Sequence, residues 1–215
     1  MRRSSITHQA RPVRAFFMAA AIALAGCGGG GSGPSQALAV DVYGDSILAG
    51  YGLAVTPIER MRALRPAWRI TDHATNGLAL KALVPGFAEA PRTGRVVVLS
   101  NGLVDAMQGL RGFEQDLRAA VLQLLAEGRV PVLTGLARTP HAPPLAAEYN
   151  AVTHAVAQEF GLPHAGWWEA YREGDAAPDG VHRTQAASDR LVGLLIAAID
   201  LADVFTPAGK AIHAG

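Results

Sequence analysis

The stretch Val40-Asp41-Val42-Tyr43-Gly44-Asp45-Ser46-Ile47-Leu48-Ala49-Gly50-Tyr51-Gly52 decides how this chain folds. Its alternating apolar residues predict a β-strand, and a pattern compatible with a helix begins directly after Gly44-Asp45-Ser46. Such a strand delivers the hydroxyl of Ser46 to the end of a sheet, at a helix start, where backbone N–H groups favour negative charge. Glycine, aspartate and serine are also ordinary turn residues, so the stretch is either a plain turn or a catalytic one.

Strand and helix patterns alternate along the rest of the chain. Further strands are predicted at residues 68–73, 96–99 and 130–133, and a weaker fifth at 164–168. Between them lie segments whose apolar residues share a helical face, as in Phe113, Leu117 and Val121. This alternation indicates right-handed βαβ units in a parallel sheet, with the ligand beyond the carboxyl ends of the strands. Ser46 falls at one of those ends.

The N-terminus has the pattern of an export signal. Four arginines and no acidic residue precede the apolar run 15–25, which is too short to span a membrane. The run ends in Leu24-Ala25-Gly26-Cys27, which resembles the lipobox of bacterial lipoproteins, where the cysteine is lipidated and becomes the first mature residue. The alternative is an ordinary cleavage site followed by an incidental cysteine. Residues 28–36 are rich in glycine, serine and proline and predict a flexible tether.

These patterns divide the chain into a signal peptide (1–26), a lipidated cysteine with its tether (27–37), one domain (38–202) and a tail (203–215). We expect the domain to be a monomer attached through lipid to the bacterial envelope, on the periplasmic side of the outer membrane. The formal net charge of +1 includes the four signal arginines; without them 15 basic residues face 18 acidic ones, about −3. No basic run follows the signal, so nucleic-acid binding is not expected.

Asp179-Gly180-Val181-His182 stands just before the last helical pattern. A spacing of three puts both side chains on one side of a turn, where the carboxylate can orient the imidazole. The other ring nitrogen is then free to take a proton from a serine hydroxyl. None of the histidines has a metal-ligand spacing, so we expect neither a metal nor a cofactor.

Four short blocks together resemble the GDSL, or SGNH, hydrolases over roughly residues 38–201. The stretch from Gly44 to Gly52 resembles the first block and residues 179–182 resemble the last. Between them, Asn76-Gly77 resembles the second block and Ser100-Asn101-Gly102-Leu103-Val104-Asp105 the third. The branch most similar to the first block contains arylesterases, lysophospholipases and thioesterase I.

The resemblance implies a flavodoxin-like three-layer α/β/α sandwich around a parallel, five-stranded sheet. It also implies hydrolysis of small-molecule esters or thioesters through an acyl-serine intermediate. Ser46 would be the nucleophile, His182 the general base and then acid, and Asp179 the orienting carboxylate. The N–H groups of Ser46 and Gly77 would form the oxyanion hole.

The sequence departs from the family pattern at one position. The family's Gly-x-Asn-Asp supplies an asparagine side chain to the oxyanion hole, whereas Gly102-Leu103-Val104-Asp105 has valine there. We expect Asn101, close by, to supply the third hydrogen bond; otherwise the hole has only two backbone donors.

Two alternatives to the esterase remain at this point. One is a deacetylase of cell-wall or exopolysaccharide sugars, and the other is a surface lipoprotein that binds a ligand without catalysis. Some apolar residues line either an acyl pocket or the core: Met107, Leu110, Phe113 and Trp167-Trp168.

We predict that the mature protein begins at a lipid-modified Cys27. Replacing the thiol in Cys27→Ser should release the domain from the membrane fraction or block its processing. The check is an intact-mass measurement of the natural protein, and an unmodified thiol at Cys27 would contradict the prediction.

Overall fold

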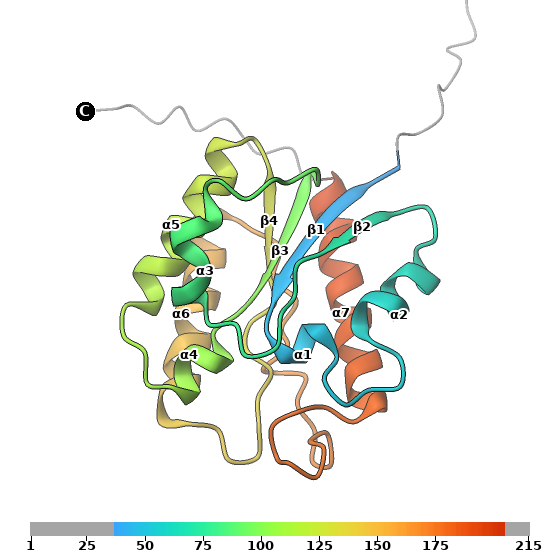
Figure 1. Ribbon diagram of the computed structural model, residues 1–215, viewed down its shortest axis with the longest axis vertical. Helices are drawn as coiled ribbons and strands as arrows, with labels where there is room; N and C mark the ends of the chain where they lie inside the picture. Colours follow the sequence, from blue (N-terminus) through green and yellow to red (C-terminus); the bar gives the residue numbers. More distant parts are fainter. Residues whose placement is uncertain (1–36, 205–215) are drawn as a thin grey trace, which may run out of the picture. The chain divides into compact units, whose positions relative to one another are not determined.

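The central strand of the fold is β1 (Ala39–Gly44), within a computed structural model that describes residues 37–204 (Figure 1). It pairs in parallel with β2 (Arg69–Asp72) on one side and β3 (Val96–Ser100) on the other. β4 (Val130–Leu133) pairs in parallel with β3, which gives the strand order β2-β1-β3-β4. All four strands lie where the sequence predicts them.

Burial distinguishes the inner strands from the edge. All five residues of β3 are buried, as a strand covered on both faces requires, and their sequence is a continuous apolar run ending in serine. In β2, at the edge, only Ile70 is buried. The pairing of Gly44 with Ser100 brings the carboxyl ends of β1 and β3 side by side.

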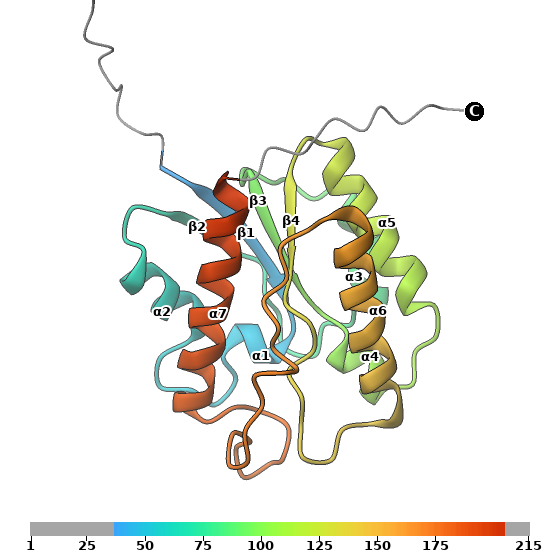
Figure 2. The same ribbon diagram turned by 180° about the vertical axis from the view of Figure 1, so that it is seen from behind.

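Helices cover both faces of the sheet, which gives the three-layer α/β/α arrangement (Figures 1 and 2). One layer contains α2 (Pro57–Leu64) and α7 (Gln185–Val204); the other contains α3 (Leu80–Phe87), α5 (Phe113–Ala126) and α6 (Pro144–Phe160). The short helices α1 (Ser46–Ala49) and α4 (Leu103–Met107) follow the carboxyl ends of β1 and β3.

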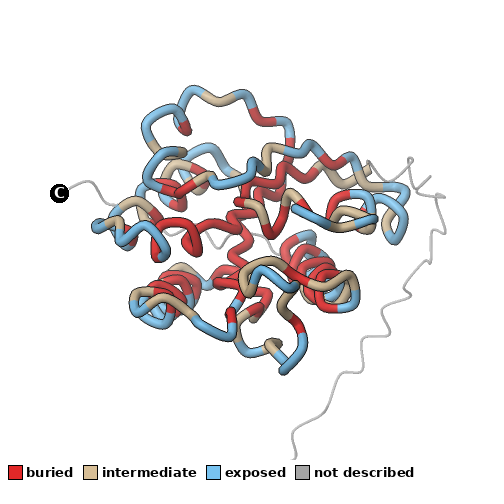
Figure 3. Tube along the Cα trace, turned by 60° about the horizontal axis from the view of Figure 1, so that its bottom comes forward, coloured by how far each residue is buried: buried red, intermediate tan, exposed pale blue. Residues whose placement is uncertain are grey.

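The side-chain alternation of the strands explains the two layers of core. Val96 and Val98 of β3 pack with the α2 and α7 side, whereas Val97 and Leu99 pack with the α3, α5 and α6 side. Figure 3 shows the buried residues concentrated in the sheet and on the helix sides that face it.

The prediction of a fifth strand at residues 164–168 is wrong. This segment runs beside β4 but makes only one bridge, between His164 and Leu133. The Ala165 N–H donates to the Leu133 carbonyl at 2.9 Å, and then Gly166 adopts φ +64°, outside the extended region. The positive φ interrupts the extended backbone after this single bridge, although the Trp167 N–H still donates to the Thr134 carbonyl at 3.0 Å, so the sheet of the described residues has four strands.

Several sequence predictions lie outside the described residues: the signal peptide, Cys27, the tether up to residue 36 and the tail from residue 205. Residues 203 and 204, assigned above to the tail, are the last turn of α7. Between residues 37 and 204, no helix has both the length and the apolar character needed to cross a membrane.

Two leucines of α7 test the packing of this helix against the sheet. Leu195 is fully buried, so Leu195→Ala should lower the free energy of unfolding by about 2–5 kcal/mol through lost burial and a cavity. Leu201 is 62% exposed, and Leu201→Ala is the matched control, expected within roughly 0.5 kcal/mol of the parent. Urea unfolding of both variants measures the difference, and equal losses would show that α7 is not packed as described.

Candidate active site

The turn after β1 places Ser46 at the carboxyl end of the sheet. Asp45 caps α1, because its Oδ1 accepts a hydrogen bond from the Ile47 N–H at 3.0 Å, and Ser46 is the first residue of the helix. Gly44 is needed for close packing here: a Cβ at this position would lie 2.8 Å from Leu48 and 3.2 Å from the Cβ of Ser100. The Gly-Asp-Ser sequence therefore fixes the direction in which the hydroxyl leaves the sheet.

The structure brings Ser46, His182 and Asp179 together, with the ring of His182 hydrogen-bonded to the other two side chains. Nε2 of His182 lies 2.9 Å from Oγ of Ser46, and Nδ1 lies 2.7 Å from Oδ2 of Asp179. Oδ1 of Asp179 also accepts from the backbone N–H groups of Val181 and His182, each at 2.9 Å. The ring of Tyr51 packs against the imidazole with the centroids 4.4 Å apart.

The charge state of Asp179 fixes the tautomer of the histidine. The hydrogen bond from His182 and the two backbone N–H groups lower the pKa of this carboxyl to about 2, although its side chain is exposed. An ionised carboxylate only accepts, so Nδ1 of His182 donates to it. Nε2 of the neutral ring is then the acceptor that faces the hydroxyl of Ser46.

A tight turn after β2 carries Gly77. The N–H of Leu78 donates to the Thr75 carbonyl at 3.2 Å, and Gly77, third in the turn, has φ +73°, as a type II turn requires. The N–H of Thr75 donates to the Gly44 carbonyl at 3.0 Å, which joins this turn to the nucleophile turn. Within residues 37–204, the N–H groups of Ser46 and Gly77 have no protein acceptor, so both are available to a ligand.

These groups share one open cavity of about 410 Å³. Its lining residues are Ser46, Tyr51, Asn76, Gly77, Val104, Met107, Gln108, Val181 and His182. Sequence reasoning missed Tyr51 and Gln108 as lining residues, although Tyr51 stands in the first block and Gln108 lies one helical turn after Val104. Met107, a candidate pocket residue, does line the cavity; Trp167 and Phe113 are each 2% exposed and belong to the core.

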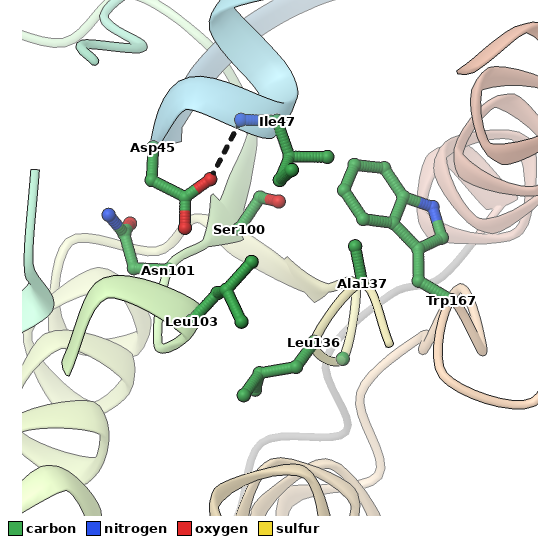
Figure 4. Close-up of a pocket in the computed structure, with 9 residues that line it drawn as sticks. Asp45, Ile47, Ser100, Asn101, Leu103, Leu136, Ala137 and Trp167 are labelled. Carbon is green, nitrogen blue, oxygen red and sulfur yellow. Dashed lines mark hydrogen bonds between the residues drawn. The ribbon is translucent and has the colours of Figure 1, made fainter. Parts of the chain in front are cut away.

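The structure does not bring Asn101 to this cavity. Its Nδ2 donates to the carbonyl of Leu78 at 3.0 Å, and its side chain lines a separate cavity of about 10 Å³ behind the nucleophile turn (Figure 4). Gly102, at φ +121°, turns the chain into α4, so that Val104 and not Asn101 meets the open cavity. At position 104, where the Gly-x-Asn-Asp pattern has asparagine, the cavity is therefore lined by a valine side chain without an amide.

Comparison with known proteins identifies the fold. No family model and no curated protein matches the chain. Among solved structures it is similar to TesA (23% identity, TM-score 0.62, 76% of this chain and 98% of the other). It is also similar to a lipolytic G-D-S-L family protein from Veillonella parvula (16%, 0.65, 76% and 99%) and to the esterase EstA from Pseudoalteromonas sp. (14%, 0.61, 76% and 97%). The chain therefore has the fold of the G-D-S-L and SGNH hydrolases.

The arrangement contains the groups that activate a serine hydroxyl as a nucleophile. A base contacts the hydroxyl, a carboxylate orients the base, and two free N–H groups adjoin the same cavity. In the described part of the chain, no group of three or more His, Cys, Asp or Glu side chains could hold a metal ion.

A fluorophosphonate probe should add covalently to Ser46, since the contact with His182 activates this hydroxyl above other serines. Intact mass followed by peptide mapping measures the adduct. His182→Ala should slow labelling by about 10³-fold or more, and Asp179→Ala by less. Ser188, which is buried, is the internal control, and labelling spread over other serines would contradict the assignment.

Proposed function

We propose that this protein is a serine esterase that hydrolyses carboxylic esters or thioesters through an acyl-serine intermediate. The observation that carries the proposal is the position of His182, which contacts Ser46 at 2.9 Å and Asp179 at 2.7 Å beside an open, largely apolar cavity. The fold is also that of esterases and lipolytic enzymes.

Acylation begins when Nε2 of His182 takes the proton from Ser46 as Oγ attacks the substrate carbonyl carbon. The C=O π electrons move to the oxygen, and the N–H groups of Ser46 and Gly77 stabilise the resulting negative charge. The imidazolium then gives its proton to the leaving alcohol or thiol as the bond from the carbonyl carbon breaks. This step leaves an ester between the acyl group and Oγ of Ser46.

Deacylation repeats the sequence with water as the nucleophile. His182 takes a proton from water, hydroxide adds to the acyl carbon, and the acid leaves as Ser46 recovers its proton from the imidazolium. Asp179 stabilises the imidazolium in both halves because it stays ionised in mild acid, with its pKa at about 2. It accepts the Nδ1–H throughout.

The lining of the cavity favours an apolar acyl group over a sugar. Tyr51, Val104, Met107 and Val181 surround the nucleophile and offer hydrocarbon or ring surface. Besides Ser46 and His182, its polar lining groups are the side chains of Asn76 and Gln108 and the hydroxyl of Tyr51, which is few for a hydroxyl-rich sugar. Deacetylation of cell-wall or exopolysaccharide sugars is therefore the second candidate.

We also propose that lipid on Cys27 anchors the enzyme in the bacterial envelope. The export signal and the Leu-Ala-Gly-Cys sequence support this part. The domain begins at β1, whose first residue lies at the opposite end of the sheet from Ser46.

The test is hydrolysis by the purified, signal-less domain of nitrophenyl esters with acyl chains of two to twelve carbons, of acyl-CoA and of acetylated sugars. We expect turnover of esters with a preference for chains longer than acetyl, and Ser46→Ala should reduce kcat by roughly 10⁵-fold or more. Preference for acetylated sugars would favour the deacetylase. No Ser46-dependent turnover of any substrate would indicate the non-catalytic binding protein.

A further inference from the structure

Asn101 joins two of the sequence blocks from behind the active site. Its Nδ2 donates to the carbonyl of Leu78, the residue directly after Gly77. The turn that contains Gly77 and Leu78 is held at its start by the hydrogen bond from the Thr75 N–H to the Gly44 carbonyl. Asn101 is therefore the side chain that fixes the far end of the turn that presents the Gly77 N–H.

The other end of the Asn101 amide lacks a partner. Its Oδ1 is buried, and no donor within residues 37–204 reaches it. A buried acceptor left without a hydrogen bond costs about 1–3 kcal/mol, so such an atom calls for an explanation. The amide cannot simply be turned over, because Nδ2 is needed as the donor to Leu78.

Asp45 offers the missing donor if its carboxyl group carries a proton. Asp45 is 2% exposed and lines the same enclosed cavity of about 10 Å³ as Asn101. Figure 4 shows both residues at this cavity, with Oδ1 of Asp45 accepting from the Ile47 N–H. The cavity has room for about one water molecule, so a single water is enough to join the carboxyl group of Asp45 to Oδ1 of Asn101.

The surroundings of Asp45 favour the neutral acid. Burial above all, opposed by the Ile47 N–H and the charge of Arg183 and supported by the charge of Asp105, raises the pKa of this carboxyl to about 7. Arg183 gives its Nη donors to the carbonyls of Arg138 and Val181, and Asp105 accepts from the N–H groups of Leu80 and Lys81. No cation of the described chain pairs with Asp45.

We propose that Asp45 is a carboxylic acid that donates its proton to Oδ1 of Asn101, and that Asn101 in turn positions the Gly77 N–H through the carbonyl of Leu78. Asp45 and Asn101 are then positioning residues that act through Gly77, in a site whose third-block amide is replaced by Val104. The kinetic part of this proposal rests on the proposed esterase function. The protonation part does not.

The protonation of Asp45 can be measured without any activity. In Ser46→Ala protein, the ¹³C shift of the Asp45 carboxyl should titrate near pH 7, with Asp45→Asn identifying the signal. Folding then takes up a proton between about pH 4 and 7, because the folded-state pKa is raised above the unfolded value of roughly 3.9. The free energy of unfolding should therefore fall across this range and level off above it, more steeply than in Asp45→Asn. A carboxyl that titrates below about pH 5 would overturn the proposal.

The coupling is tested by a double-mutant cycle on ester turnover at pH 6. Asp45→Ala and Asn101→Ala should each lower kcat by about 10–100-fold with KM changed by less than about threefold, since the substrate cavity is untouched. The double variant should lose clearly less than the product of the two single losses, because Asp45 acts partly through Asn101 and partly as the cap of α1. Losses that multiply would overturn the proposal.

Two further variants separate positioning from a merely structural role. Asp45→Asn can still accept from Ile47 and donate to Asn101 but cannot ionise, so it should retain most of the kcat at pH 6. The ratio of parent kcat to Asp45→Asn kcat should then fall as the pH rises through about 7, and a pH-independent ratio would contradict the proposal. Val104→Asn adds an amide at the open cavity, so any gain in kcat should be the same with or without Asn101; a gain found only in Asn101→Ala would show that Asn101 is itself an oxyanion donor. If Ser46→Ala left turnover unchanged, the esterase proposal would fail while the Asp45 titration stood.

Discussion

The hydrogen bond between His182 and Ser46 is the contact on which the rest of the candidate site depends, and it joins residues 136 positions apart. It forms only if the irregular segment before α7 is held over the carboxyl ends of the strands. Buried Arg183 anchors that segment through the carbonyls of Arg138 and Val181, each at 2.7 Å. The segment also closes on itself, since the Ala177 N–H donates to the His182 carbonyl at 2.8 Å. His182 thus lies in an irregular segment that these hydrogen bonds hold in place.

The start of α7 ties this support to the nucleophile side. The side-chain amide of Gln185 both accepts from the Val55 N–H and donates to the Val55 carbonyl, at 3.1 and 3.0 Å. Val55 lies in the loop that follows α1 and leads into α2, and the same loop carries Tyr51 against the imidazole. Gln185 therefore links the start of α7, which follows His182, to the loop that follows Ser46. The two residues of the 2.9 Å contact come from distant parts of the chain, and these hydrogen bonds join the segments next to each of them.

The local sequence pattern predicted most of the fold because strands that are covered on both faces have continuous apolar runs in the sequence. The branched runs of β3 and β4 are apolar at every core position, and the structure has strands there. The segment 164–168, His-Ala-Gly-Trp-Trp, has no branched aliphatic residue, and Gly166 with its positive φ interrupts the extended backbone there. The sequence shows that a glycine is present, but it does not show whether its backbone adopts a positive φ. The closeness of Ser46, Asp179 and His182 was predictable from two short motifs, one at the end of a strand and the other just before the last helix.

The role of Asn101 was not predictable, because two neighbouring positions compete to face the cavity and a single backbone torsion decides between them. Gly102 has no Cβ, so it can take φ +121° and lie close to the Phe113 ring, from which a Cβ would be only 2.8 Å away. With this torsion, Val104 lines the same cavity as Ser46. Asn101 then faces backward, where its amide holds Leu78. The open cavity offers the N–H groups of Ser46 and Gly77, and Val104 adds no donor beside them. In the oxyanion hole proposed above, two backbone N–H groups would stabilise charge only as well as their turns are fixed, so the hydrogen bonds behind Gly77 would matter more than in a hole with three donors.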